Sequence, residues 1–110
     1  MSASLPTQLE ALEGRSPQHY GTLQRHLPLL RTALENATRP YPTSRQLYEQ
    51  LEDPPIPPHT FGRLVALLVD FGIIAIYTER SSANRYDIRA YDAADLDELA
   101  ALLAYRTARA

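Results

Sequence analysis

Apolar residues in the first half of the chain recur at spacings of three and four, the period of one face of an α-helix. Between residues 16 and 38 this face consists of Tyr20, Leu23, Leu27, Leu30 and Leu34. Ser16 followed by Pro17 is a helix-start signal, an N-cap with proline in the first helical position. Pro28 lies inside the pattern and removes a backbone hydrogen bond, so we expect the helix to kink or restart there.

A stretch with two prolines interrupts the helical pattern at residues 39–43. A residue that precedes proline is disfavoured in the α region, so this stretch should be extended. Ser44 is the expected N-cap of a second helix, which has Leu47 and Leu51 on one face. A turn with four prolines, over residues 52–58, ends that helix.

A third helix is predicted to begin at about His59 or Thr60, with Thr60 as its candidate cap, and to end before Gly72. Residues 64–69 are all apolar. A helix that is apolar on nearly all sides is usually buried on more than one side. The third helix could therefore pack on the core through one face and on a partner protein through another.

After Gly72 the pattern changes from the helical period to alternation. Residues 73–78 and 86–91 are rich in β-branched and aromatic side chains, which favours two strands of a hairpin. The polar residues between them should form its tip, near Ser81–Asn84. Asp92, with an acidic residue three positions later, resembles a capping box that opens a last helix.

The last helix has a stripe of leucines at spacings typical of helix pairing. These are Leu96, Leu99, Leu102 and Leu103. The stripe exposes more apolar surface than a lone terminal helix usually leaves in water, which predicts a homodimer formed partly by residues 93–109. The alternative is that the stripe packs onto the first helix of the same chain.

The predicted fold class is mainly α with a small β-hairpin. Residues 1–15 would be an N-terminal extension, weakly ordered or a short helix. Residues 16–92 would form the main domain, and residues 93–110 a C-terminal helix and candidate dimerisation element. With 110 residues, the chain has room for one domain with one modest core.

A string of residues across the third helix and the following strand matches a familiar pattern: Thr60 and Phe61, then Val65, Leu68, Gly72, Ile73 and Ile74. Together with the element order over residues 19–92, it resembles the winged helix-turn-helix family. That family includes MarR- and PadR-like regulators and the tail domain of archaeal origin-recognition initiators. In such domains the pattern is the recognition helix running into the first wing strand.

The residues from Pro42 to Leu47 resemble the start of the family's second helix, and those from Arg85 to Ile88 resemble its returning wing strand. The long proline-rich turn departs from the family.

The resemblance implies double-stranded DNA as the partner, with the third helix in the major groove and the hairpin tip on the backbone or minor groove. All 11 basic residues are arginine, which suits phosphate and guanine recognition. A net charge of −2 argues against indiscriminate coating of nucleic acid, so DNA binding must depend on local segregation of charge.

The candidate DNA-binding residues come from the helices and the hairpin. They are Arg39, Ser44, Arg45, His59, Thr60, Arg63, Arg80, Ser81, Ser82, Arg85 and Arg89. Among them Arg63, Arg80 and Arg85 have the strongest claim, and the hairpin arginines should matter more than the third helix. The alternative is an ordinary solvated surface, because the same part of the chain holds six carboxylates. These are Glu49, Glu52, Asp53, Asp70, Glu79 and Asp87.

The sequence gives little support to catalysis. It has no cysteine, its three histidines are not spaced to hold one metal ion, and no nucleophile–base order or phosphate-cradling loop is present. We expect no enzymatic activity, no cofactor and no metal.

The start of the chain lacks a signal peptide, and no apolar stretch approaches the roughly 20 residues of a membrane span. The expected protein is soluble, cytoplasmic and without a membrane partner.

The sequence thus favours a sequence-specific DNA-binding protein, a transcriptional regulator acting as a homodimer. The rival hypothesis is a winged helix for protein–protein contact, which would dock a partner through the apolar third helix or the Leu-rich C-terminal helix.

Overall fold

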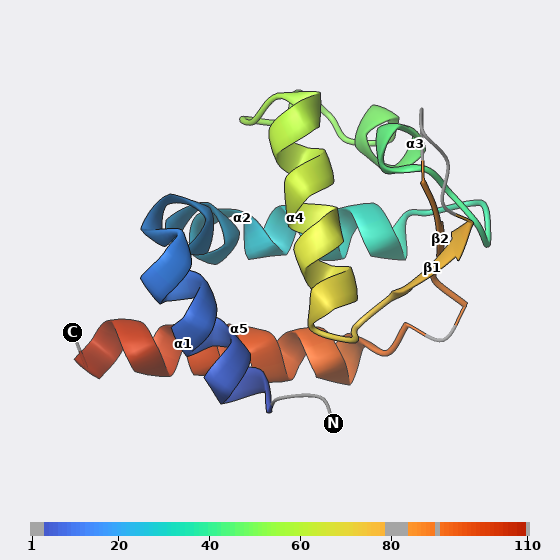
Figure 1. Cartoon of the computed structure of the whole chain (residues 1–110). Helices are drawn as coiled ribbons and strands as arrows, with labels where there is room; N and C mark the ends of the chain where they lie inside the picture. Colours follow the sequence, from blue (N-terminus) through green and yellow to red (C-terminus); the bar gives the residue numbers. More distant parts are fainter. Residues whose placement is uncertain (1–3, 79–83, 90, 110) are drawn as a thin grey trace.

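The computed structural model describes residues 4–78, 84–89 and 91–109 of the chain (Figure 1). In this part the fold is mainly helical with a small antiparallel sheet, as the sequence predicts. The elements in chain order are α1 (Leu5–Arg15), α2 (Pro17–Glu35), α3 (Ser44–Glu49), α4 (Pro58–Asp70), β1 (Ala75–Thr78), β2 (Arg85–Asp87) and α5 (Ala93–Arg109). No helix among these residues has the length and apolar content needed to cross a membrane.

Helix α2 is the central element of the fold. It packs against α1, α3, α4 and α5, and Figure 1 shows α4 crossing in front of it while α5 runs below. Leu23 and Leu30 of α2 are completely or almost completely buried. They meet leucines from each of the long helices, so the protein has a single hydrophobic core.

Helix α1 is part of that core. Its Leu9 and Leu12 are almost fully buried, and α1 packs on α2. Of the two alternatives for residues 1–15, the helix is correct for residues 5–15, and this helix contributes to folding because it removes two leucines from water.

The predicted interruption of the first long helix is present in α2. His26 has φ −115° and ψ 15°, outside the helical region, two residues before Pro28. Pro28 has no N–H to donate to the carbonyl of Gln24, four residues earlier, and its ring clashes with that carbonyl. The prediction of a kink near Pro28 is therefore confirmed.

The N-terminal cap of α3 differs by one residue from the prediction. Thr43, not Ser44, is the N-cap: its Oγ1 accepts from the Gln46 amide at 3.1 Å, and its own amide donates to Gln46 Oε1 at 3.0 Å. This reciprocal pair is a capping box, which satisfies two amides that the helix leaves unpaired. Ser44 is consequently the first helical residue.

Helix α4 starts earlier than predicted. Its N-cap is Pro57 and its first residue Pro58, whose fixed φ is already helical. Thr60 therefore lies inside the first turn and is not the cap. At the other end Gly72 has φ 78°, and the Ile73 amide donates to Leu68 O at 2.9 Å, so glycine ends the helix as predicted.

The sheet is shorter than the sequence indicates. β1 and β2 are antiparallel, Ile76 lies opposite Tyr86, and an irregularity in register follows. β1 begins two residues later than the predicted strand over residues 73–78, and β2 ends at Asp87, before the end of the predicted strand over residues 86–91. Ile73 and Ile74 precede β1 and are buried, because they pack in the core rather than pair with β2.

Residues 40–43 pair with the free edge of β2. The Tyr86 amide donates to Pro42 O at 2.9 Å, the Ile88 amide donates to Pro40 O at 3.3 Å, and Thr43 forms an antiparallel bridge with Arg85. The prolines accept here and need no N–H, which suits the edge of a sheet. The chain bends at residues 39–41, and Thr43 has an extended backbone, so the prediction of an extended stretch over residues 39–43 holds only at its end, where the segment connects the hairpin to the start of α3.

The leucine stripe of α5 faces the core of its own chain. Leu96, Leu99 and Leu103 are at most 2% exposed, and Leu102 is half-buried. The assignment of Leu96, Leu99 and Leu103 to a dimer interface is therefore wrong, because packing against the same chain, α2 in particular, already removes them from water, whereas for Leu102 the assignment stays a prediction. A homodimer stays a prediction, but three of the four leucines on which it was based are buried within the chain.

Candidate nucleic-acid interface

The exposed face of α4 is polar and narrow. His59, Arg63 and Ala66 are exposed and recur at helical spacing, so they share one side of the helix. The opposite sides are buried through Phe61, Leu64, Val65, Leu67 and Leu68. The large apolar side chains of this helix are therefore buried or half-buried within the chain, so they offer little exposed surface for the predicted docking of a partner on an apolar third helix.

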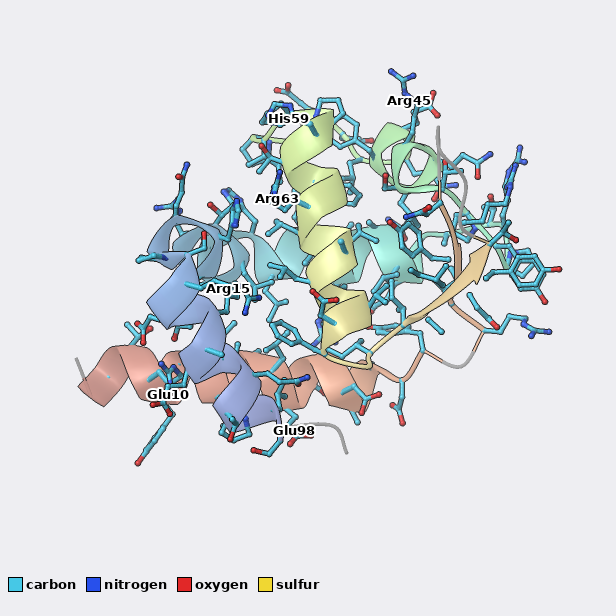
Figure 2. All side chains as sticks on the ribbon, viewed as in Figure 1. Glu10, Arg15, Arg45, His59, Arg63 and Glu98 are labelled. Atoms are coloured by element: carbon cyan, nitrogen blue, oxygen red, sulfur yellow. The ribbon has the colours of Figure 1, made fainter. Side chains whose placement is uncertain are left out.

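Arg45 lies at the same end of the molecule. It is exposed on α3, and Figure 2 shows it beside the start of α4, where His59 lies, with Arg63 one turn further along. The structure records no ion pair for Arg45 or Arg63 with the residues it describes. Figure 2 places Glu98 at the opposite end, on α5.

The short distance between α3 and α4 fixes the position of Arg45 relative to Arg63. A Cβ placed on Gly62 would lie 3.3 Å from Ser44 Oγ, so the helices meet where one of them has no side chain. Ser44 is half-buried in this contact, and Thr60 is half-buried as well. The Ser44 hydroxyl faces Gly62, and both side chains keep part of their surface open, so phosphate binding by Ser44 and DNA contact by Thr60 stay predictions.

Two of the hairpin arginines have hydrogen-bond partners in the same chain. Arg85 is half-buried, and its Nη1 donates to Tyr41 O at 3.1 Å. Arg89 pairs with Asp87 through Nε and Nη2, both at 3.2 Å, and its guanidinium lies 4.9 Å from the centre of the Tyr41 ring. These hydrogen bonds from Arg89 hold the pKa of Asp87 below its ordinary value. Both arginines therefore support the hairpin before they can contact a ligand.

The remaining candidates divide into two groups. Arg39 is exposed just before residues 40–43. Arg80, Ser81 and Ser82 lie outside the described residues, as does most of the predicted hairpin tip. The sequence gives Arg63, Arg80 and Arg85 the strongest claim to DNA contact. Among those of the three that the structure describes, Arg63 is exposed and has no ion-pair partner, whereas Arg85 is half-buried and hydrogen-bonded.

Carboxylates accompany these arginines. Glu49, Glu52 and Asp53 are exposed on α3 and in the turn before α4. The arginine surface is therefore mixed in sign, and its binding to a polyanion has to come from the geometry of a few side chains rather than from a strongly positive field.

Comparison with protein-family models, curated protein sequences and solved structures gives no match. Inferences about function therefore depend on the residues themselves.

Sequence reasoning did not identify one feature of this surface, a pair of stacked tyrosines. The rings of Tyr41 and Tyr77 have centroids 3.9 Å apart and planes inclined by 22°. Tyr41 lies in residues 40–43 and Tyr77 in β1, 36 positions apart. No pattern in the sequence indicated this stack, because residues 40–43 and β1 each pair with β2 and not with one another, so only the tertiary structure brings the two tyrosines together.

Proposed function

We propose that the chain is a winged-helix module that binds duplex DNA sequence-specifically and acts as a transcriptional regulator. The observation that supports it most is the exposed face of α4, where His59 and Arg63 lie one turn apart on a helix whose large apolar side chains are buried or half-buried. The order of elements, with residues 40–43 and a hairpin paired into one small sheet, agrees with that architecture.

The shape of α4 suits the major groove. Ala66 shares the exposed face with Arg63 and has a small side chain, so the helix can approach the base edges closely. An arginine there can donate two hydrogen bonds to O6 and N7 of guanine, which is the commonest specific contact in the major groove. His59, in the first turn, would contact a neighbouring base or phosphate.

Arg45 has a different part in this arrangement. It extends from the neighbouring helix at the same end of the protein, which suits a phosphate contact beside the groove (Figure 2). Such contacts fix the register of a protein on DNA but carry no sequence information. The acidic residue Glu98, at the opposite end, would face away from the duplex, whereas the exposed carboxylates on α3 and in the turn before α4 lie near the arginines and would weaken phosphate binding there.

This proposal assigns base readout to α4 and a smaller role to the described hairpin arginines than the sequence favours. Arg85 and Arg89 already have partners in the protein, so a phosphate would have to compete with Tyr41 O and with Asp87.

The test is fluorescence anisotropy with two duplexes, one selected by the protein from a random pool and one random. Arg63→Ala should lower affinity for the selected duplex roughly 10- to 100-fold and change random-duplex affinity much less. Arg45→Ala should weaken both duplexes alike and reduce the slope of log affinity against log salt by about one.

Arg15→Ala is the matched control, because Arg15 is also an exposed arginine but lies on α1, away from the end that Arg45 occupies (Figure 2). It should bind both duplexes as the unchanged protein does. Equal losses for Arg15→Ala and Arg63→Ala, or no binding to any duplex by the unchanged protein, would contradict the proposal.

A further inference from the structure

The stacked tyrosines lie on an exposed part of the sheet. Tyr77 is 55% exposed although its ring stacks on Tyr41, and the neighbouring Ile76 is 37% exposed. A large aromatic side chain normally loses most of its water contact on folding. The Tyr77 ring is instead held in a fixed orientation by Tyr41 while more than half of the residue remains open to a ligand.

Arginines surround this pair. Arg89 lies over the Tyr41 ring, Arg85 donates to the Tyr41 carbonyl, and Arg39 is exposed two residues before Tyr41 in the chain. Among the described residues, ion pairing at this surface neutralises Arg89 alone, through Asp87. The tyrosines therefore lie in a cationic setting that does not depend on the overall charge of the chain.

We propose that this surface, the tyrosine stack of Tyr41 and Tyr77 with its arginines, binds unpaired bases of single-stranded DNA. Every nucleobase has a flat π face that stacks on an exposed aromatic ring, and a cationic surface attracts the phosphates between the bases. A neutral proline-rich peptide also docks on aromatic rings, but it gains nothing from the surplus arginines. The charge thus favours a nucleic-acid strand over such a peptide.

The stack is close to the surface assigned to duplex DNA. Residues 40–43 lead directly from Tyr41 into the capping box of α3, and α3 packs against α4. A strand that leaves a duplex held on α4 would reach the sheet with little intervening protein. This part of the inference rests on the proposed function, and it makes DNA with a single-stranded extension the preferred ligand.

The test uses the full chain and two labelled oligomers of 15 units. One is oligothymidylate, and the other is an abasic phosphodiester of the same length and charge. The unchanged protein should bind oligothymidylate more tightly than the abasic oligomer. Tyr77→Ala should weaken oligothymidylate binding about 5- to 100-fold, as expected for the loss of one base–aromatic stack. Tyr77→Phe retains the ring and should bind within about twofold of the unchanged protein.

The controls separate this inference from the proposed function. Tyr77→Ala should leave binding to a blunt duplex unchanged, and Arg63→Ala should leave oligothymidylate binding unchanged. Tyr77 is exposed, so its replacement should retain the fold, which circular dichroism melting would verify. Equal affinity for the thymidylate and abasic oligomers, or equal thymidylate affinity of the Ala and Phe variants, would overturn the stack as a base-binding site. Neither result would affect duplex binding by α4.

Discussion

Gly62 on α4 faces Ser44 on α3 so closely that a Cβ at Gly62 would lie 3.3 Å from the Ser44 hydroxyl oxygen. This contact sets the separation of the two helices that carry the exposed arginines of the proposed DNA surface. A distance of 3.3 Å is shorter than an ordinary van der Waals contact between a carbon and its neighbour, so a methyl group there requires the serine to shift. The glycine therefore has a packing role despite its poor helix propensity.

We predict that the effect of Gly62→Ala depends on Ser44. In a Ser44→Ala background the facing oxygen is gone, and Gly62→Ala should stabilise the protein by about 0.5–1 kcal/mol through helix propensity. In the unchanged protein the same substitution should gain less or destabilise. Denaturant unfolding of the four proteins of this double-mutant cycle measures the difference, which should reach about 0.5 kcal/mol or more.

Gly21→Ala is the control for that cycle. Gly21 also lies inside a helix, α2, and a Cβ there meets nothing within 4 Å. Its gain in stability should be the same with serine or alanine at position 44. Additive effects of Gly62→Ala and Ser44→Ala would show that the contact places no constraint on the packing of α3 against α4.

We predict that Arg89→Ala raises the pKa of Asp87 toward its ordinary value of 3.8, because the hydrogen bonds from Arg89 hold it lower. A carboxyl whose pKa is lower in the folded than in the unfolded chain stabilises the fold above the unfolded pKa. That contribution disappears as pH falls through the folded-state pKa. Carboxyl NMR titration of Asp87 between pH 2 and 6 would measure the change.

Arg45→Ala is the matched control, since Arg45 is an exposed arginine on another element. It should leave the Asp87 titration where it is. A carboxyl pKa for Asp87 that is the same with and without the Arg89 guanidinium would show that the ion pair does not persist in solution. Arg89 would then be available to a ligand.

We predict that Leu99→Ala destabilises the protein by about 2–5 kcal/mol, independently of protein concentration. Leu99 is 0% exposed inside its own chain, so the cost is the loss of a buried side chain plus the resulting cavity. A leucine in a dimer interface would instead make the melting temperature depend on concentration. Thermal unfolding of both proteins over a hundredfold range of concentration distinguishes the two cases.

Leu102→Ala serves for comparison, because Leu102 is half-buried on the same helix. Its cost should be clearly smaller, since less of its surface leaves water on folding. Melting temperatures that rise with concentration in the unchanged protein and not in Leu99→Ala would restore the dimer interface at this position.

The features that could be predicted from the sequence are those decided by neighbours in the chain. Proline removes its own N–H and clashes locally, so the kink near Pro28 follows from the sequence alone. Gly72 ends α4 because a positive φ suits glycine, and Asp92 caps α5 by accepting from the Ala94 amide. Periodicity likewise locates the helices and the change to strand, since it reports which side chains share a face.

The candidate site was predicted less completely, because it depends on partners far apart in the chain. The Arg85 guanidinium is engaged by Tyr41 O, 44 residues away, and the stack of Tyr41 on Tyr77 exists only once the sheet has formed. Periodicity shows that Leu96 and Leu99 share a face, but it cannot show whether that face packs on α2 or on a second chain. The sequence by itself determined which stretches form helices or strands, where α2 bends and where α4 ends, because those features depend on periodicity and on backbone geometry within a few residues. Only the tertiary structure decided which apolar faces are buried within the chain and which arginines remain exposed, because burial and ion pairing depend on how distant segments meet.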